Sequence, residues 1–211
     1  EYDDFYFRLT TVQEIDTKNQ KVISEIGDLH YDYLVIATGS KTNFFGNKDI
    51  ESNAMAMKSI PQSLNISSLI LENFEQAVIT KDQAEKDALI NFVLVGAGPT
   101  GVELAGALAE MKKAILQKDY PDLDISKMQI NLIQAEDRVL NTMSEKSSKA
   151  AEKFLEKLGV KVWKSVRVTN YDGRTVTTSV NVSFETATVI WTAGVEGAPI
   201  AGLNSDALVE R

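Results

Sequence analysis

The most constraining feature of the sequence is a set of three closely spaced glycines that follows a short apolar run. Residues 92–95 are branched or aromatic throughout, which predicts a buried strand. Gly96, Gly98 and Gly101 come next, and small apolar residues after Pro99 predict a helix. A strand that turns sharply into a helix needs glycine where the backbone adopts a positive φ or passes close to another group. We therefore expect a strand–turn–helix unit of an α/β fold.

The pattern after this unit extends the α/β prediction. Residues 129–133 and 160–163 predict two more strands, with an amphipathic helix between them that ends at Gly159. An apolar run at residues 188–191 predicts another strand. Strands that alternate with helices favour a parallel sheet, so the expected fold is α/β with a parallel sheet.

The first part of the chain is harder to interpret. Residues 1–37 predict short strands, and residues 34–37 are apolar on both faces, which predicts a strand buried in a parallel sheet. Residues 41–60 resemble a loop, and apolar spacing predicts a helix over residues 61–83. Residues 80–88 are strongly charged and predict a surface connection.

Composition excludes several classes of function. The chain has a formal net charge of −8, no cysteine and a single histidine, His30. Nucleic-acid binding needs clustered Lys and Arg, so no nucleic-acid partner is expected. Disulfides, cysteine-ligated metals and redox cysteine pairs are excluded, and no metal site is expected. The most apolar window, residues 88–111, carries Glu103 and Pro99, which argues against a membrane span.

The glycine turn has a specific physical interpretation. Gly96-x-Gly98-x-x-Gly101 directly follows a predicted strand and begins a helix, which is the context of a dinucleotide-binding turn. The first glycine permits the tight turn, the second lets a pyrophosphate approach the backbone, and the third allows close packing. Free N–H groups at the helix start then hold the phosphates. The alternative is a tight turn that binds no ligand.

The second predicted strand should end in a carboxylate that accepts hydrogen bonds from the adenosine ribose. Gln134 stands at that tip instead, and Glu136 follows two residues later. The separation from Gly96 exceeds the usual ~20 residues because of an insertion before the strand. A neutral amide does not repel a 2′-phosphate, so the sequence is compatible with NADPH as well as NADH as the cofactor. Arg138 could meet that phosphate, or it could be a solvated surface arginine.

Three segments together resemble a known enzyme family. They are "YDYLVIATGSKTNFFG", "VLVGAGPTGVELAGALAEM" and "VIWTAGVEGAPIAGL". The chain resembles type II NADH dehydrogenases, the single-subunit NADH:quinone oxidoreductases of the FAD/NAD(P)-dependent pyridine nucleotide-disulfide oxidoreductase superfamily. The resemblance extends over essentially the full chain, and "DYPDLD", "AEDRVL" and "WTAGV" add to it.

The resemblance implies a Rossmann-like, two-dinucleotide-binding flavoprotein fold. Residues 1–48 would be part of the FAD-binding domain, and residues 49–89 a connecting segment with a helix. Residues 90–194 would be the NAD(P)H-binding domain, and residues 195–211 the return toward the FAD domain. The chain would then be an internal fragment, with the main FAD-binding motif before it and membrane-binding helices after it.

The resemblance also implies roles for individual residues. Those around the NADH pyrophosphate would be Gly96, Ala97, Gly98, Pro99, Thr100 and Gly101. Those near the adenosine ribose would be Gln134 and Ala135, although the family commonly has glutamate at the first position. Those near the nicotinamide or the flavin edge would be Thr192, Ala193 and Gly194. Those touching FAD would be Ala37, Thr38 and Gly39. Glu103 would be a catalytic residue near both rings; the alternative is a charge favoured by the helix dipole.

The implied activity is that of an NADH dehydrogenase of the respiratory chain that does not pump protons. It passes a hydride from NADH to FAD and electrons to a quinone. The implied location is cytoplasmic, on the inner face of the membrane as a peripheral protein. The resemblance leaves both a monomer and a homodimer as options. Two alternatives stay open, a soluble flavin-dependent ferredoxin or rubredoxin reductase and a non-catalytic NAD(P)H-binding module. We expect the chain alone to be colourless and to lack the activity.

Overall fold

The structure is a computed structural model and describes residues 4–203. The chain divides into two compact units. The larger is Thr42–Val195, and the smaller joins Glu1–Lys41 to Glu196–Arg211. Each unit is described by itself.

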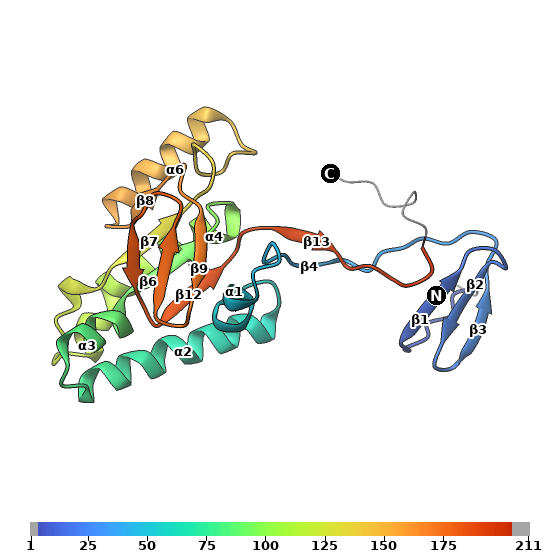
Figure 1. Cartoon of the computed structure of the whole chain (residues 1–211), viewed down its shortest axis with the longest axis horizontal. Helices are drawn as coiled ribbons and strands as arrows, with labels where there is room; N and C mark the ends of the chain where they lie inside the picture. The colour runs from blue at the N-terminus through green and yellow to red at the C-terminus, as the bar shows by residue number, and fades with distance from the viewer. Residues whose placement is uncertain (1–3, 204–211) are drawn as a thin grey trace. The chain divides into compact units, whose positions relative to one another are not determined.

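The larger unit is built on a parallel sheet of five strands, in the order β5-β12-β6-β7-β8 (Figure 1). These strands are β5 (Met55–Ala56), β6 (Phe92–Val95), β7 (Ile130–Ile133), β8 (Lys161–Trp163) and β12 (Thr188–Trp191). Every residue of β6, β7 and β12 is buried. A strand buried on both faces must be covered by two layers, which explains why these sequences are mainly apolar rather than alternating. The strands predicted at residues 92–95, 129–133, 160–163 and 188–191 are confirmed.

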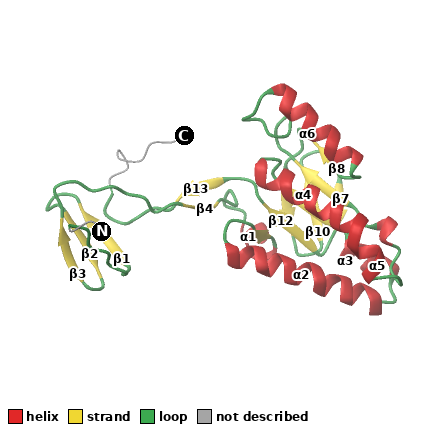
Figure 2. Ribbon diagram, turned by 180° about the vertical axis from the view of Figure 1, so that it is seen from behind, coloured by secondary structure: helices red, strands yellow, loops and turns green. Residues whose placement is uncertain are grey.

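Helices cover one face of this sheet (Figure 2). They are α2 (Ile60–Ile79), α4 (Pro99–Met111) and α6 (Glu145–Lys157). Alternate strand residues supply the sheet side of this core, with helix residues packed against them: Phe92, Leu94, Ile130, Leu132 and Ile190 from strands, and Ile66, Phe74, Ala105, Leu108 and Leu155 from helices. Strand side chains alternate between faces, so the remaining strand residues point the other way.

A second layer covers the opposite face. It contains the antiparallel strands β9 (Val168–Tyr171), β10 (Thr175–Thr178) and β11 (Ser183–Glu185), together with the short helix α1 (Lys48–Asn53). The buried residues of this core are Ile50, Val93, Val95, Ile133, Val166, Val168, Tyr171, Val176, Val189 and Trp191. The parallel sheet is therefore the middle of three layers, which confirms the α/β prediction.

The helix α4 continues beyond its regular part. A π-helical segment, Lys112–Leu116, leads into α5 (Gln117–Asp119), and a 3₁₀ turn at Ile125–Lys127 precedes β7. Tyr120 anchors this insertion, because its ring stacks on Phe74 of α2 with the ring centroids 5.2 Å apart. The extra residues between β6 and β7 thus form an ordered cover over α2.

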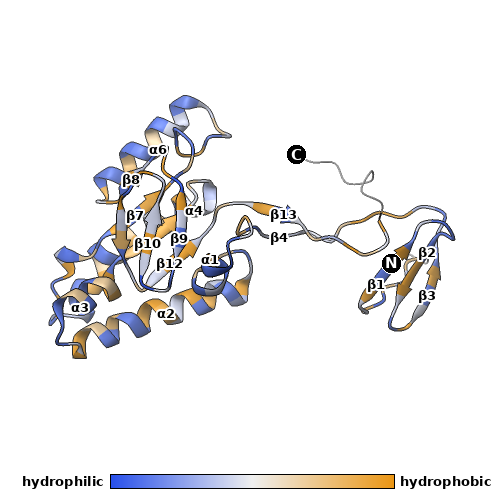
Figure 3. Ribbon diagram, in the orientation of Figure 1, coloured by the Kyte–Doolittle hydropathy of each residue, from blue (hydrophilic) through white to orange (hydrophobic). Residues whose placement is uncertain are grey.

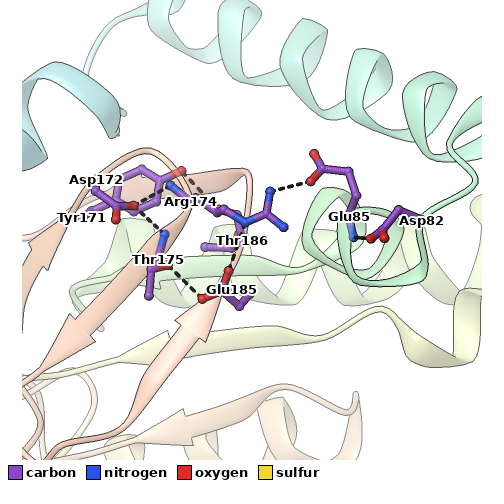
Figure 4. A network of polar contacts seen from close by, with 8 residues as sticks. All are labelled: Asp82, Glu85, Tyr171, Asp172, Arg174, Thr175, Glu185 and Thr186. Atoms are coloured by element: carbon purple, nitrogen blue, oxygen red, sulfur yellow. Dashed lines mark hydrogen bonds and ion pairs between the residues drawn. The ribbon is translucent and has the colours of Figure 1, made fainter.

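The helix α3 (Gln83–Ile90) is tied to the turn between β9 and β10 (Figure 4). Arg174 in that turn forms ion pairs with Glu85 of α3 and Glu185 of β11. Asp172 accepts hydrogen bonds from the backbone N–H groups of Arg174 and Thr175 at 2.9 and 2.7 Å. The groups are exposed, so these ion pairs set the geometry of the turn more than they stabilise it.

The smaller unit contains an antiparallel sheet of β1 (Val12–Asp16), β2 (Lys21–Ser24) and β3 (Gly27–His30). Two short strands adjoin the unit boundary and pair with each other, β4 (Ser40–Thr42) and β13 (Val195–Gly197).

Two sequence predictions are wrong in detail. Residues 34–37 form no strand, and Val35 is 87% exposed. A parallel strand needs neighbouring strands and covered faces, and the described residues bring none to this segment. Residues 41–60 and 80–88 were predicted to be connections, but they contain α1 and most of α3. Both helices begin at a side-chain cap, from Asn47 and Asp82, which stabilises helices too short to show periodicity.

Apolar residues are concentrated in the central strands, whereas polar residues are frequent along α6 (Figure 3). Within residues 4–203, no helix combines the length and apolar character needed to cross a membrane.

Candidate functional site

Gly96 is required by the packing of the protein itself. It has a φ of +102°, a region that other L-residues rarely adopt. A Cβ atom there would lie 2.7 Å from the backbone nitrogen of Ala193. The Gly96 N–H donates to the carbonyl of Ile133 at 2.8 Å, which ties the turn to β7. The first glycine is therefore fixed by the turn and by its neighbours.

Gly101 is also required by packing. A Cβ atom at this position would overlap the carbonyl oxygen of Gly96 and lie 2.8 Å from the Thr192 hydroxyl oxygen. That hydroxyl donates to the carbonyls of Val95 and Gly96 at 2.9 and 2.8 Å. The start of α4 therefore packs directly on the turn.

Gly98 differs from the other two glycines. A Cβ atom there would meet no protein atom within 4 Å, and its φ of −72° suits any residue. Gly98 is the N-cap of α4 and supplies no side-chain cap. Among the described residues, the N–H groups of Gly98, Thr100 and Gly101 have no hydrogen-bond acceptor. The protein's own packing thus gives no reason for glycine here, whereas a ligand that approaches the backbone does.

Gly98 lies on the wall of a cavity of about 790 Å³. The cavity crosses the carboxyl ends of three adjacent strands, β12, β6 and β7, where ligands bind in open α/β sheets. Its lining consists of Phe44, Phe45, Asn47, Ile50, Val95, Gly96, Gly98, residues 133–136, Asn141, residues 166–169 and residues 191–194.

Amides and a carboxylate form the end of the cavity beyond β7. Gln134 is buried, and its Oε1 accepts a hydrogen bond from the Ala97 N–H at 2.7 Å. Its Nε2 donates to Oε2 of Glu136, which also accepts from Nδ2 of Asn141 at 2.7 Å. Arg138 does not line the cavity, and its guanidinium donates to the backbone carbonyl of Asn141.

Aromatic rings form the end of the cavity beyond β12. Trp191 is buried, and its indole N–H donates to the Asn43 carbonyl at 3.0 Å. Phe45 has a φ of +53° and a largely exposed side chain, and it lies close enough to Gly194 to exclude a Cβ atom there. Phe44 packs on Trp191 with the ring centroids 5.8 Å apart. A flat ring would find apolar walls at this end.

A second cavity of about 450 Å³ lies near the start of α2. Thr100, Thr192 and Gly194 line it together with residues 57–60 and Ser63. Thr192 and Gly194 therefore face both cavities, and Thr100 faces only this one.

The structure brings together only part of the predicted site. Gly96, Gly98, Gln134, Ala135, Thr192, Ala193 and Gly194 line the larger cavity. Ala97, Pro99 and Gly101 shape the turn without lining it, and Glu103 is exposed on α4 outside both linings. Ala37, Thr38 and Gly39 lie in the smaller unit, where the Thr38 hydroxyl donates to the Ala198 carbonyl at 2.8 Å.

Sequence reasoning did not single out several residues of the cavity wall, among them Asn141, Arg167, Phe44 and Phe45. Asn141 and Arg167 stand in segments with no motif, and only the folded structure brings both to the cavity wall. The consecutive Phe residues before Gly46 were a usable signal, because exposed aromatic pairs in a glycine-containing loop often mark binding surfaces.

Comparison with known proteins agrees with this geometry. A model of the family described as "Pyridine nucleotide-disulphide oxidoreductase" matches residues 3–210. The chain belongs to this family.

Curated relatives confirm the resemblance to type II enzymes. The chain is 34% identical to the type II NADH:quinone oxidoreductase NdhA of Mycobacterium tuberculosis, over 91% of this chain and 43% of that protein. It is 31% identical to the external alternative NAD(P)H-ubiquinone oxidoreductase B1 of Arabidopsis thaliana, over 89% of this chain and 36% of that protein. The chain thus spans less than half the length of these relatives.

Solved structures show the same fold. The NDH2 of Plasmodium falciparum, solved in complex with NADH, matches with a TM-score of 0.80 and 23% identity, over 90% of this chain and 41% of that one. A ferredoxin reductase from Rhodopseudomonas palustris matches with a TM-score of 0.65 and 16% identity, over 88% of this chain and 40% of that one. The Rossmann-like flavoprotein fold expected from the sequence is confirmed.

Proposed function

We propose that the larger unit binds NADH in the cavity above Gly98, and that the complete protein is an NADH:quinone oxidoreductase. One observation carries the proposal. Of the three glycines in the turn, Gly98 alone has no packing reason to be glycine, and it faces an open cavity. A pyrophosphate that contacts the backbone supplies that reason.

Different parts of the cavity would bind different parts of NADH. The N–H groups of Gly98, Thr100 and Gly101, at the positive end of the α4 dipole, would bind the phosphates. The aromatic end near Phe45 and Gly194 would receive the nicotinamide ring. Ala97 and Gln134 would keep the turn in place through their hydrogen bond.

In the complete protein, NADH would supply a hydride and FAD would accept it before electrons pass to a quinone. The protein would contribute orientation and exclude water. Ala37, Thr38 and Gly39 would contact FAD, and residues 1–48 and 195–211 would belong to its domain. Glu103 would lie near the reacting rings. Its side chain is exposed on α4.

The names of the relatives support the acceptor in this proposal. Two are named for quinone or ubiquinone reduction. We accordingly propose a peripheral enzyme on the inner face of the membrane. Other parts of the complete protein would make the membrane contact, and the enzyme could be a monomer or a homodimer.

A soluble ferredoxin reductase is the second candidate, supported by the fold match to such an enzyme. A non-catalytic NAD(P)H-binding module is the third.

A segment exchange tests the proposed function. Residues 42–195 replace the matching segment of the Mycobacterium tuberculosis relative. The exchanged protein should hold FAD and oxidise NADH with a quinone as acceptor. The Gly98→Ala change within it should raise the NADH concentration needed for half-maximal oxidation by about tenfold or more, while the flavin spectrum stays the same. A folded, flavin-loaded protein that oxidises no NADH would overturn the proposal. Turnover with a ferredoxin but not with a quinone would favour the second candidate.

If the exchanged protein holds no flavin, a direct titration of the 211-residue chain with NADH decides the binding part of the proposal. Energy transfer from Trp191, on the cavity wall, to the bound nicotinamide should rise to saturation. An unchanged signal together with no heat of binding would contradict it.

A further inference from the structure

Both functional ends of the Gln134 amide are occupied within the protein. Oε1 accepts from the Ala97 N–H at 2.7 Å, and Ala97 is fully buried. A backbone N–H can only donate, so the oxygen of the amide must face Ala97. The amide nitrogen then faces Glu136 and donates to it. Gln134 therefore joins the glycine turn to Glu136, and its amide oxygen is directed at Ala97.

The Glu136 carboxylate is held in position from two sides. Nε2 of Gln134 and Nδ2 of Asn141 both donate to its Oε2 atom. The other oxygen, Oε1, accepts no hydrogen bond from any residue in the described part of the chain. The backbone is also fixed, because the Glu136 carbonyl accepts from the Ser165 N–H at 2.8 Å. The carboxylate is exposed on the cavity wall beyond β7.

We propose that Glu136 is the residue that binds the adenosine ribose and selects NADH over NADPH. This inference rests on the proposed function, since it assumes a dinucleotide in the cavity. A carboxylate with a free oxygen accepts hydrogen bonds from ribose hydroxyls and repels a 2′-phosphate. The carboxylate that the fingerprint places at the strand tip is thus provided two residues later, and Gln134 acts as its positioning residue.

The other polar groups nearby are each held in place by a hydrogen bond within the protein. The Gln134 and Asn141 amide groups already donate to Glu136, and the Arg138 guanidinium donates to the Asn141 carbonyl. Arg167 is the one cation among the described residues of this lining, so the weak NADPH binding that remains should depend on it. The NADPH option suggested by the neutral side chain of Gln134 is therefore not favoured by the geometry.

Titration of the 211-residue chain with NADH and with NADPH tests the inference. The unchanged chain should prefer NADH by about tenfold or more, since a charged hydrogen bond is replaced by repulsion. Glu136→Gln should lower this preference by about tenfold. Asp137→Asn is the matched control, because it removes the neighbouring exposed carboxylate that does not line the cavity. It should leave the preference unchanged.

Gln134→Glu distinguishes the two possible ribose-binding positions. If Glu136 is the ribose-binding residue, this change places a second carboxylate against it and weakens the binding of both nucleotides. A sharper preference for NADH in Gln134→Glu would instead assign ribose binding to position 134 and overturn the inference. Glu136→Asp keeps the charge with a shorter reach, and it should retain discrimination against NADPH while it loses affinity for NADH.

The outcomes separate this inference from the proposed function. Binding of neither nucleotide by the folded, unchanged chain would contradict the function itself. Binding of both with equal affinity, or a preference that Glu136→Gln leaves intact, would overturn only the role of Glu136. Circular dichroism of each variant confirms that the fold is retained.

Discussion

Gly98 and Gly106 offer the sharpest comparison between single residues. Neither would place a Cβ atom within 4 Å of another group, but only Gly98 lines the cavity. Gly98→Ala should leave stability nearly unchanged and weaken NADH binding by about tenfold or more, since a charged acceptor loses hydrogen bonds worth roughly 1.5–3 kcal/mol each. Calorimetric titration and thermal unfolding measure the two effects.

Gly106→Ala is the control for this experiment. Gly106 lies inside α4 in open space, so alanine should stabilise the helix by up to about 1 kcal/mol without changing NADH binding. Equal binding by the two variants would mean that no ligand approaches Gly98.

The site could be predicted from sequence where backbone geometry decides it, and not where side chains from distant segments meet. Gly96 and Gly101 follow from the turn alone. The interpretation of Gln134 failed to anticipate its bond to Ala97, because spacing shows which residue follows a strand and not which neighbour occupies its side chain. Asn141 and Arg167 reach the cavity through tertiary contacts that no local pattern records.

The packing of α4 on the β6 turn gives a prediction about an element. Gly101→Ala would force a methyl group onto the Gly96 carbonyl, which is part of the backbone and cannot rotate away. The variant should lose about 2 kcal/mol or more of unfolding free energy, as core overpacking does. Urea denaturation measures the change, and a variant as stable as the original chain would show that α4 packs differently.

The layer formed by β9–β11 gives a prediction about pH. Burial raises the pKa of Tyr171 from 10.0 to about 12, and its hydroxyl donates to the Thr186 carbonyl at 3.3 Å. Since the folded-state pKa lies above the unfolded one, the contribution of the neutral phenol is complete below pH 10 and is lost as the pH rises toward 12. The loss is on the order of 2 kcal/mol.

Tyr171→Phe tests this contribution. Denaturation curves at neutral pH and above pH 10 should show that the variant loses less stability with rising pH than the original chain. Parallel curves for the two proteins would assign the alkaline loss to other groups.

The helices and strands differ in how well sequence predicts them. Long periodic segments such as α2 and mainly apolar strands such as β6 and β12 were predicted, because burial on one or two faces determines their pattern. The short helices α1 and α3 were not, since their stability depends on caps from Asn47 and Asp82 and on packing against distant strands. Residues 34–37 have the pattern of a buried strand, but pairing depends on neighbours that the pattern does not reveal.

The division of the chain into two units leads to a prediction about independence. Every residue that lines the larger cavity belongs to Thr42–Val195. A shortened chain of residues 42–195 should therefore fold and bind NADH with an affinity within about threefold of that of the complete chain. Parallel titrations of both chains test this, and loss of binding in a folded short chain would mean that the smaller unit contributes to the site.

The exposed apolar side chains of the smaller unit fit the proposed flavoprotein. Phe5, Tyr6, Phe7, Tyr33 and Val35 are all largely exposed. We propose that they pack against other parts of the complete protein around FAD, in keeping with a chain that spans less than half of its relatives.

A crystal structure of residues 42–195 grown with NADH is the most direct measurement. It should show the two phosphates against the backbone N–H groups of Gly98 and Thr100, the adenosine ribose beside Glu136, and the nicotinamide near Gly194. A dinucleotide bound elsewhere, or one whose phosphates stay away from the glycine turn, would contradict the proposed site.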